Sequence, residues 1–204
     1  MQRRRNYHHG NLRDALITAA MQMLEKEGPE AISFRALART AGVSQTAPYN
    51  HFESKEDLLA TVARLGFREL VRTQRATAAA ENTGEKRIIA LGLDYIRFAL
   101  AQPQLYRLMF GAGVTEWQAH PEVAEAKAES FLPVSEALAQ HLGYEGKADQ
   151  EAIETTAISA WALVHGLSML LIDRTLDPAG KGPGDAKTLA SRVVTSFVEG
   201  LKNR

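Results

Sequence analysis

A short stretch near the amino terminus groups amide and hydroxyl side chains that can hydrogen-bond to a ligand. The segment Ser33–Phe52 reads SFRALARTAGVSQTAPYNHF, and its polar groups after Ser44 that we expect to be exposed are Gln45, Thr46 and Asn50. Amide side chains such as Gln and Asn hydrogen-bond well to adenine, and the Thr methyl group suits the thymine methyl. These positions hold neither Arg nor Lys, the usual readers of guanine. If this segment entered a groove of double-stranded DNA, these residue types would favour contacts to A·T pairs.

The residue types in this stretch also meet the packing requirements of a helix-turn-helix. Ala38 is small where the second helix must approach the first, and Gly42 can adopt the positive φ that the turn requires. Val43 then fills the core, and Ser44 is expected to cap the second helix. The pattern predicts two helices joined by a tight turn.

The second helix of this motif contains one conflict. Tyr49 and Phe52 are expected to face inward, as its apolar groups. Pro48 stands about four residues into the helix, where it removes one N–H donor and disfavours helical geometry at Ala47. We therefore expect a distorted first turn.

The charge distribution points to a polyanionic partner at one end of the chain. The net charge of the 204 residues is zero, but residues 1–55 hold 8 Lys/Arg against 5 Asp/Glu, and the remainder holds 16 against 19. Arg3, Arg4 and Arg5 open the chain without a neighbouring acid; they suit either a groove contact or a solvated tail. Such a basic front on an acidic body favours nucleic-acid binding at the front.

Composition argues against several other classes of protein. The sequence has no cysteine, which excludes disulfides, thiolate metal sites and a cysteine nucleophile. No HExxH, GxSxG or P-loop pattern occurs, so we expect no enzyme activity, no metal and no cofactor. The most apolar stretch, Ala157–Ile172, is short and interrupted, which favours a buried helix over a membrane span. With no secretory signal in view, we expect a cytoplasmic protein.

Apolar residues recur at helical spacing along the whole chain, which predicts an all-α fold. Asn11, Ser33, Ser44 and Ser54 are the expected caps of the early helices. The first three helices are short and closely spaced, and this predicts a head over 1–55 and a larger helical body over 56–204. The predicted helices span residues 11–27, 33–40, 44–50, 54–81, 85–101, 103–110, 121–142, 149–175 and 185–202.

The amino-terminal quarter resembles the DNA-binding head of TetR/AcrR-type transcriptional regulators. The resemblance covers Tyr7–Leu59 and includes the run Gly42-Val-Ser44, Tyr49-x-His51-Phe52 and Ser54-Lys55. Further on, Trp161-x3-His165-Gly166 is similar to the Trp-His-Gly signature of one C-terminal class of that family.

This resemblance implies a three-helix head that binds double-stranded DNA and a body that binds a small molecule and forms a homodimer. The second helix of the motif would enter the major groove, and Tyr49, His51 and Lys55 would contact phosphates. The expected DNA-binding residues are Arg3, Arg4, Arg5, Ser33, Arg35, Ser44, Gln45, Thr46, Ala47, Tyr49, Asn50, His51 and Lys55.

The body carries aromatic and sulfur-containing side chains that suit a mostly apolar effector. Each of them could equally be part of the core, and Trp161 with His165 could be a satisfied core pair beside a close helix contact at Gly166. The expected ligand-binding residues are Tyr95, Phe98, Tyr106, Met109, Phe110, Trp117, Phe131, Trp161, His165 and Met169.

Two helices of the body, 149–175 and 185–202, are apolar on more than one face, which favours a dimer interface. The expected interface residues are Ile153, Ala157, Ala160, Val164, Leu167, Leu189, Val193 and Phe197. The combined prediction is a ligand-responsive dimeric regulator, most often a repressor in this family, that binds a pseudo-palindromic operator. The alternatives are a helical protein-interaction module without DNA binding and, less favoured, an enzyme.

Overall fold

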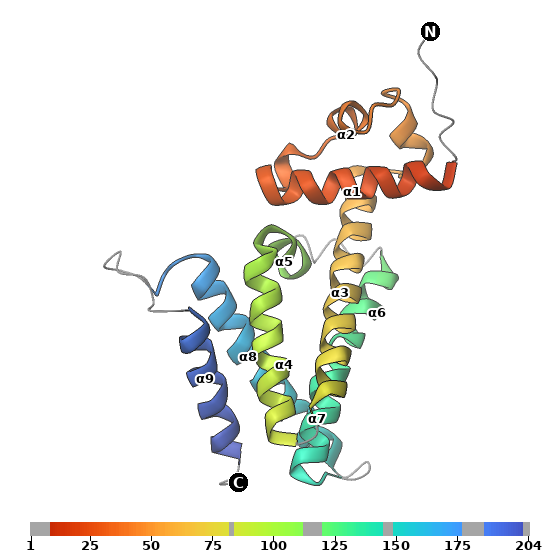
Figure 1. Cartoon of the computed structure of the whole chain (residues 1–204). Helices are drawn as coiled ribbons and strands as arrows, with labels where there is room; N and C mark the ends of the chain where they lie inside the picture. The colour runs from red at the N-terminus through yellow and green to blue at the C-terminus, as the bar shows by residue number, and fades with distance from the viewer. Residues whose placement is uncertain (1–8, 82–83, 112–119, 145–148, 177–185, 202–204) are drawn as a thin grey trace. The chain divides into compact units, whose positions relative to one another are not determined.

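Every regular element in the part of the chain that the structure describes is helical, as predicted (Figure 1). This computed structural model describes residues 9–81, 84–111, 120–144, 149–176 and 186–201. The elements are α1 (His9–Glu27), η1 (Pro29–Ala31), α2 (Phe34–Ala41), η2 (Ala47–Asn50), α3 (Lys55–Ala80), α4 (Gly84–Ala101), α5 (Pro103–Phe110), α6 (Pro121–Glu129), α7 (Leu132–Leu142), α8 (Gln150–Ile172) and α9 (Ala186–Leu201).

The chain forms two compact units that share α3. Unit 1 comprises residues 1–66 and 104–125, and unit 2 comprises 67–103 and 126–204. The first part of α3 therefore belongs to unit 1, and its continuation from Phe67 belongs to unit 2. The division of function between a head over 1–55 and a body over 56–204 stays a prediction.

Unit 1 is built around the contact between α1 and α2. Leu16, Leu24 and Leu37 are fully buried, and the small Ala38 is buried as well, as the close approach of two helices requires. Helix α1 begins at His9, so Asn11 lies within its first turn and is not the cap that the sequence predicts.

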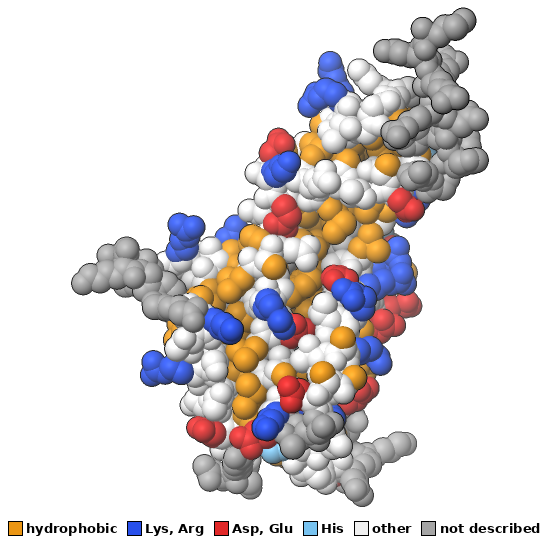
Figure 2. Space-filling view, in the orientation of Figure 1, with side chains coloured by type: hydrophobic (Ala, Val, Ile, Leu, Met, Phe, Trp, Pro, Cys, Tyr) orange, Lys and Arg blue, Asp and Glu red, His pale blue; other side chains and the backbone are white. Residues whose placement is uncertain are grey.

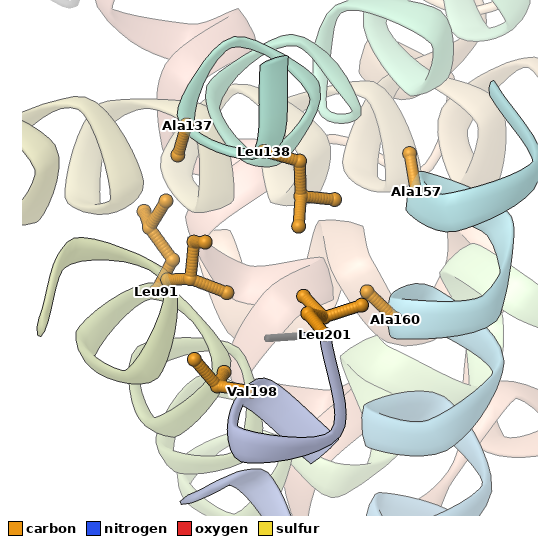
Figure 3. Close-up of a cluster of buried hydrophobic side chains, with 8 residues drawn as sticks. Leu91, Ala137, Leu138, Ala157, Ala160, Val198 and Leu201 are labelled. Carbon is orange, nitrogen blue, oxygen red and sulfur yellow. The ribbon is translucent and has the colours of Figure 1, made fainter. Parts of the chain in front are cut away.

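Unit 2 is organised around α4, which lies against α7, α8 and α9 (Figure 1). One core cluster joins these helices, and Figure 3 shows Leu91, Leu138 and Val198 converging in it. Helix α8 is long and apolar enough by composition to cross a membrane. Its packing against α4, α7 and α9 instead makes it a core helix of this unit.

Three predicted helices differ from the structure by more than one or two residues at an end. The helix predicted over 121–142 is two helices, α6 and α7, because the chain turns at Ser130–Phe131 just before Pro133, which cannot donate a backbone hydrogen bond. The helix predicted over 149–175 ends at Ile172, and Arg174 has a φ of 55°. The helix predicted over 44–50 is only the short 3-10 helix η2.

Candidate nucleic-acid interface and ligand cavity

The turn after α2 has the geometry that its sequence predicts. Gly42 adopts the left-handed conformation, with φ 68° and ψ 33°. Its N–H donates to the carbonyl of Arg39 at 3.3 Å, and the Val43 N–H donates to Ala38 at 2.9 Å. At the other end of α2, the Ser33 hydroxyl accepts a hydrogen bond from the Ala36 N–H at 3.2 Å. Together these contacts terminate α2 at both ends and fix where the following segment begins.

The segment after the turn presents its polar side chains to solvent. Gln45, Thr46 and Asn50 are all exposed. Pro48 is buried and anchors the segment, and its position in the first turn of η2 explains why the helix is short. Ser44 does not cap the helix through its side chain, because its hydroxyl instead lies 3.2 Å from the Thr46 hydroxyl. The side chains of Gln45, Thr46 and Asn50, here called the exposed row, are therefore accessible to solvent.

Phe52 and Tyr49, both predicted to face inward, differ in the structure. Phe52 is 2% exposed and carries the Arg13 guanidinium over its ring at 5.0 Å, so it is the inward-facing anchor. Tyr49 is 66% exposed, although its ring packs edge-on against Phe34 with centroids 4.9 Å apart. The prediction that Tyr49 faces inward is therefore wrong. The exposure of the residue is consistent with the predicted phosphate contact, which stays a prediction.

The start of α3 is fixed by side-chain hydrogen bonds and carries a lysine. The Asp57 N–H donates to the Ser54 hydroxyl, and the Asp57 carboxylate accepts from the Glu53 N–H, both at 3.1 Å. The first bond is the hydroxyl half of a capping box, and the second reaches the residue before the cap. Together they fix the first turn, in which Lys55 is half-buried.

Ser33 and Arg35 are exposed, His51 is half-buried, and Arg3, Arg4 and Arg5 lie outside the described residues.

A carboxylate from α1 caps the amino terminus of α5 within unit 1. Glu25 accepts hydrogen bonds from the backbone N–H groups of Leu105 at 2.7 Å and Gln104 at 3.4 Å. Both groups belong to the first turn of α5, where a negative charge is favourable. The contact links α1 to a segment 80 residues further along the chain.

Replacing Glu25 with Ala is expected to lower the free energy of unfolding by about 1 kcal/mol, because these two N–H groups lose their acceptor. Urea unfolding followed by circular dichroism measures the effect. Glu27→Ala is the matched control, because Glu27 is an exposed acid at the end of the same helix. Equal stability of the two variants would show that the cap contributes nothing.

Unit 2 contains a mostly apolar cavity of about 40 Å³. Its walls come from α3, α4, α8 and α9 and from the start of α7, and Asp, Glu, Lys and Arg are absent from the described lining. Hydrophobic side chains also gather on the surface of this unit around α4 and α9 (Figure 2). The lining residues are Gln74, Ile88, Leu91, Gly92, Tyr95, Ser130, Phe131, Val134, Ala160, Trp161, Leu163, Val164, Val194 and Phe197.

A short hydrogen-bond network stands at one wall of this cavity. The Trp161 indole N–H donates to the Tyr95 hydroxyl at 3.1 Å, and that hydroxyl lies 3.2 Å from Nδ1 of His165. Burial lowers the pKa of His165, and the charge of Lys127 lowers it further, so the imidazole is neutral at pH 7. The Tyr95 hydroxyl can then accept from Trp161 and donate to Nδ1.

The Trp161 ring also contacts two other rings, those of His165 and Phe131. The rings of Trp161 and His165 lie 4.9 Å apart, and Phe131 lies 5.5 Å from Trp161 on the cavity side. The predicted close helix contact at Gly166 is absent, because a Cβ there would meet nothing within 4 Å in the described residues. Gly92 makes the close approach instead, since its Cβ would lie 2.9 Å from Val194.

Only part of the predicted ligand set lines the cavity. Tyr95, Phe131 and Trp161 do, and His165 contacts them. Phe98 and Met169 belong to unit 2 but are not among the lining residues. The others lie elsewhere: Tyr106, Met109 and Phe110 belong to unit 1, where Tyr106 and Met109 are fully buried, and Trp117 lies outside the described residues. Gln74 lines the cavity but was not predicted from the sequence. It continues the buried i, i+3, i+7 stripe that begins at Phe67 and Leu70.

The predicted interface residues fall into two groups. Ala157, Ala160, Val164 and Leu167 are buried within their own unit, and Ala160 and Val164 line the cavity, so these four cannot offer an exposed surface. Leu189, Val193 and Phe197 on α9 are half-buried and border a shallow groove with Leu163. Ile153 is half-buried. The exposed apolar residues of α8 are instead Ile158 and Leu170, at 57% and 43%.

A helix-turn-helix with an exposed polar row, together with a separate helical unit that holds a cavity, defines the class of one-component DNA-binding regulators. In the described residues, no group of three or more acidic or His side chains is placed to hold a metal ion.

Comparison with known proteins agrees with this class. Residues 16–62 match the family described as "Bacterial regulatory proteins, tetR family", and residues 88–197 match "Tetracyclin repressor-like, C-terminal domain". The chain belongs to the TetR family of transcriptional regulators, and it is not an enzyme.

Individual relatives share both parts of the chain. A solved structure of a protein of unknown function from Rhodococcus sp. RHA1 is 31% identical, with a TM-score of 0.78, over 97% of this chain and 98% of that chain. The HTH-type transcriptional regulator YobS of Bacillus subtilis is 25% identical over 76% of each chain. The HTH-type transcriptional regulator Rv0681 of Mycobacterium tuberculosis is 24% identical over 94% of this chain and 82% of its own length.

Proposed function

We propose that this protein is a ligand-responsive transcriptional repressor of the cytoplasm that binds a pseudo-palindromic operator as a homodimer. The observation that carries the proposal is the exposed row Gln45, Thr46 and Asn50, held between the ordered turn at Gly42 and the buried anchor Phe52. Gln45 and Thr46 lie just before η2 and Asn50 ends it, and amide and hydroxyl side chains of this kind read base edges in the major groove.

The phosphate contacts would surround this row. Tyr49 is exposed beside it, and Lys55 stands in the first turn of α3, where the backbone N–H groups also favour an anion. Ser33 and Arg35 at the start of α2 add exposed polar and positive groups. Such contacts fix the register of the head on the duplex and leave sequence discrimination to the base-reading row.

The dimer would form through the outer faces of α8 and α9. Ile158 and Leu170 are exposed on α8, and Val193 and Phe197 are partly exposed on α9. Two such helices from each chain give a twofold-symmetric interface, and a twofold dimer presents two heads to two half-sites.

Regulation would follow from linkage between the cavity and the head. Helix α3 begins with Lys55 in unit 1 and contributes Gln74 to the cavity wall of unit 2. An effector that binds one arrangement of α3 better than another shifts the population of heads able to bind DNA. A coupling of about 1–3 kcal/mol changes operator affinity by about 5- to 150-fold.

Selection of genomic fragments with the purified protein, followed by footprinting, tests this function. We expect a twofold-symmetric protected site and, by sedimentation, a particle with twice the 22.4 kDa chain mass. A monomer at micromolar concentration would contradict the dimer. Failure to retain any duplex would favour the alternative, a helical protein-interaction module.

A further inference from the structure

One polar group in the wall of the unit 2 cavity has no partner. Gln74 on α3 is 4% exposed, and its side-chain carbonyl oxygen, Oε1, is buried without a hydrogen-bond partner among the described residues. A buried acceptor in this condition is costly, and native proteins rarely keep one without a reason.

The other polar groups of the described cavity wall are already satisfied. The Ser130 hydroxyl donates to the Lys127 carbonyl at 2.6 Å, and Trp161 and Tyr95 bond to each other at 3.1 Å. The rest of the described lining is aliphatic or aromatic and carries no full charge. The unmet requirement of this wall is therefore one hydrogen-bond donor that faces Gln74.

We propose that this cavity binds an uncharged, mostly apolar molecule that carries one hydroxyl or amide N–H group, and that Gln74 Oε1 accepts the hydrogen bond from this group. The proposal rests on the function proposed above, in which unit 2 holds the effector. A carboxylate or an ammonium group is disfavoured, because it would lose its hydration without an opposite charge in the described wall.

The size of the cavity links occupancy to movement of its walls. A volume of about 40 Å³ holds one or two water molecules, whereas a benzene-sized guest occupies a cavity of about 150 Å³. Binding therefore requires side chains of the wall to move, and Phe197 is one wall residue that is only half-buried. Because Gln74 belongs to α3, a guest bound to its carbonyl contacts the helix that continues into unit 1.

Three six-membered-ring probes test the chemistry of this site. Cyclohexanol can donate a hydrogen bond, methoxycyclohexane can only accept one, and cyclohexanecarboxylate is charged. Binding is read from Trp161 fluorescence in a Trp117→Phe background, since the chain has two tryptophans, and is checked by calorimetry. We expect cyclohexanol to bind about tenfold more tightly than methoxycyclohexane, and the carboxylate to bind least.

Replacing Gln74 with an apolar side chain of similar length tests whether Gln74 Oε1 causes this preference. Gln74→Met should remove the preference for the alcohol while keeping affinity for the ether, and its melting temperature should equal or exceed that of the parent protein. Gln150→Leu is the matched control, because Gln150 is exposed and outside the cavity; it should keep the preference.

Several outcomes would overturn the inference: equal affinity for alcohol and ether, no binding of either because the cavity holds water only, or a preference that survives in Gln74→Met. A lower melting temperature of Gln74→Met together with an unchanged preference would assign Gln74 a structural role. Duplex binding by the same preparations separates the two proposals. If the protein still binds duplex, a negative probe result contradicts only the cavity proposal. If all duplex binding is absent, the proposed function is contradicted as well.

Discussion

Replacing Phe52 with Ala is expected to lower the free energy of unfolding by about 3–5 kcal/mol and to abolish operator binding. The Phe52 ring is 2% exposed, anchors the segment after the turn and supports the Arg13 guanidinium. Its loss leaves a cavity beneath the exposed row and removes the geometry that the row needs. Denaturant unfolding and binding to the selected operator duplex measure the two effects.

Tyr49→Ala is the control for this variant. The Tyr49 ring is largely exposed, so its removal should cost less stability than the removal of the Phe52 ring. Operator affinity should still fall if Tyr49 contacts a phosphate. A Phe52→Ala protein that unfolds like the parent protein would show that the segment does not depend on this anchor.

The double variant Gln45→Ala, Asn50→Ala is expected to lose about 2–6 kcal/mol of operator binding, if each amide reads one base pair. The loss should be confined to the selected operator, because these side chains are assigned to base edges. Affinity for an unrelated duplex should stay nearly constant, since it depends on phosphate contacts. Titration of both duplexes by fluorescence anisotropy gives this specificity ratio directly.

The surface position of both residues makes this variant easy to interpret. Gln45 and Asn50 are exposed, so their replacement should leave the unfolding transition within about 0.5 kcal/mol of the parent protein. An equal loss of affinity for the operator and the unrelated duplex would show that these residues contact phosphates and not base edges. No loss for either duplex would remove them from the interface.

Local chemistry in this protein can be predicted from sequence where one residue type satisfies one backbone requirement. Gly42 is the clearest case, because residues with a Cβ are strained in the left-handed conformation of this turn and glycine is not. The Ser33 cap and the Ser54–Asp57 capping box are similar, because the donor and acceptor are three residues apart. The Ser44 cap failed because Pro48 shortened the helix that it was to cap.

Whether an apolar helix face lies in the core, lines a cavity or faces solvent depends on tertiary packing, so it could not be predicted from the sequence. Val164 and Ile158 lie on the same helix and are both apolar, yet Val164 lines the cavity of its own unit and Ile158 faces solvent. Periodicity reports that a face is apolar but not which partner covers it. Gln74 was not predicted to line the cavity, because a polar residue on a helix is usually assigned to the surface.

The dependence of duplex affinity on salt concentration, compared between the parent protein and Lys55→Ala, tests the DNA-binding assignment most directly. The account predicts that the parent protein binds the operator with a steep negative slope of log affinity against log salt, and that Lys55→Ala reduces the slope by about 0.9, one phosphate contact. Lys86→Ala, which removes an exposed lysine on α4 in unit 2, should leave the slope unchanged. Equal slopes for the parent protein and Lys55→Ala, or no salt-dependent duplex binding at all, would contradict the account.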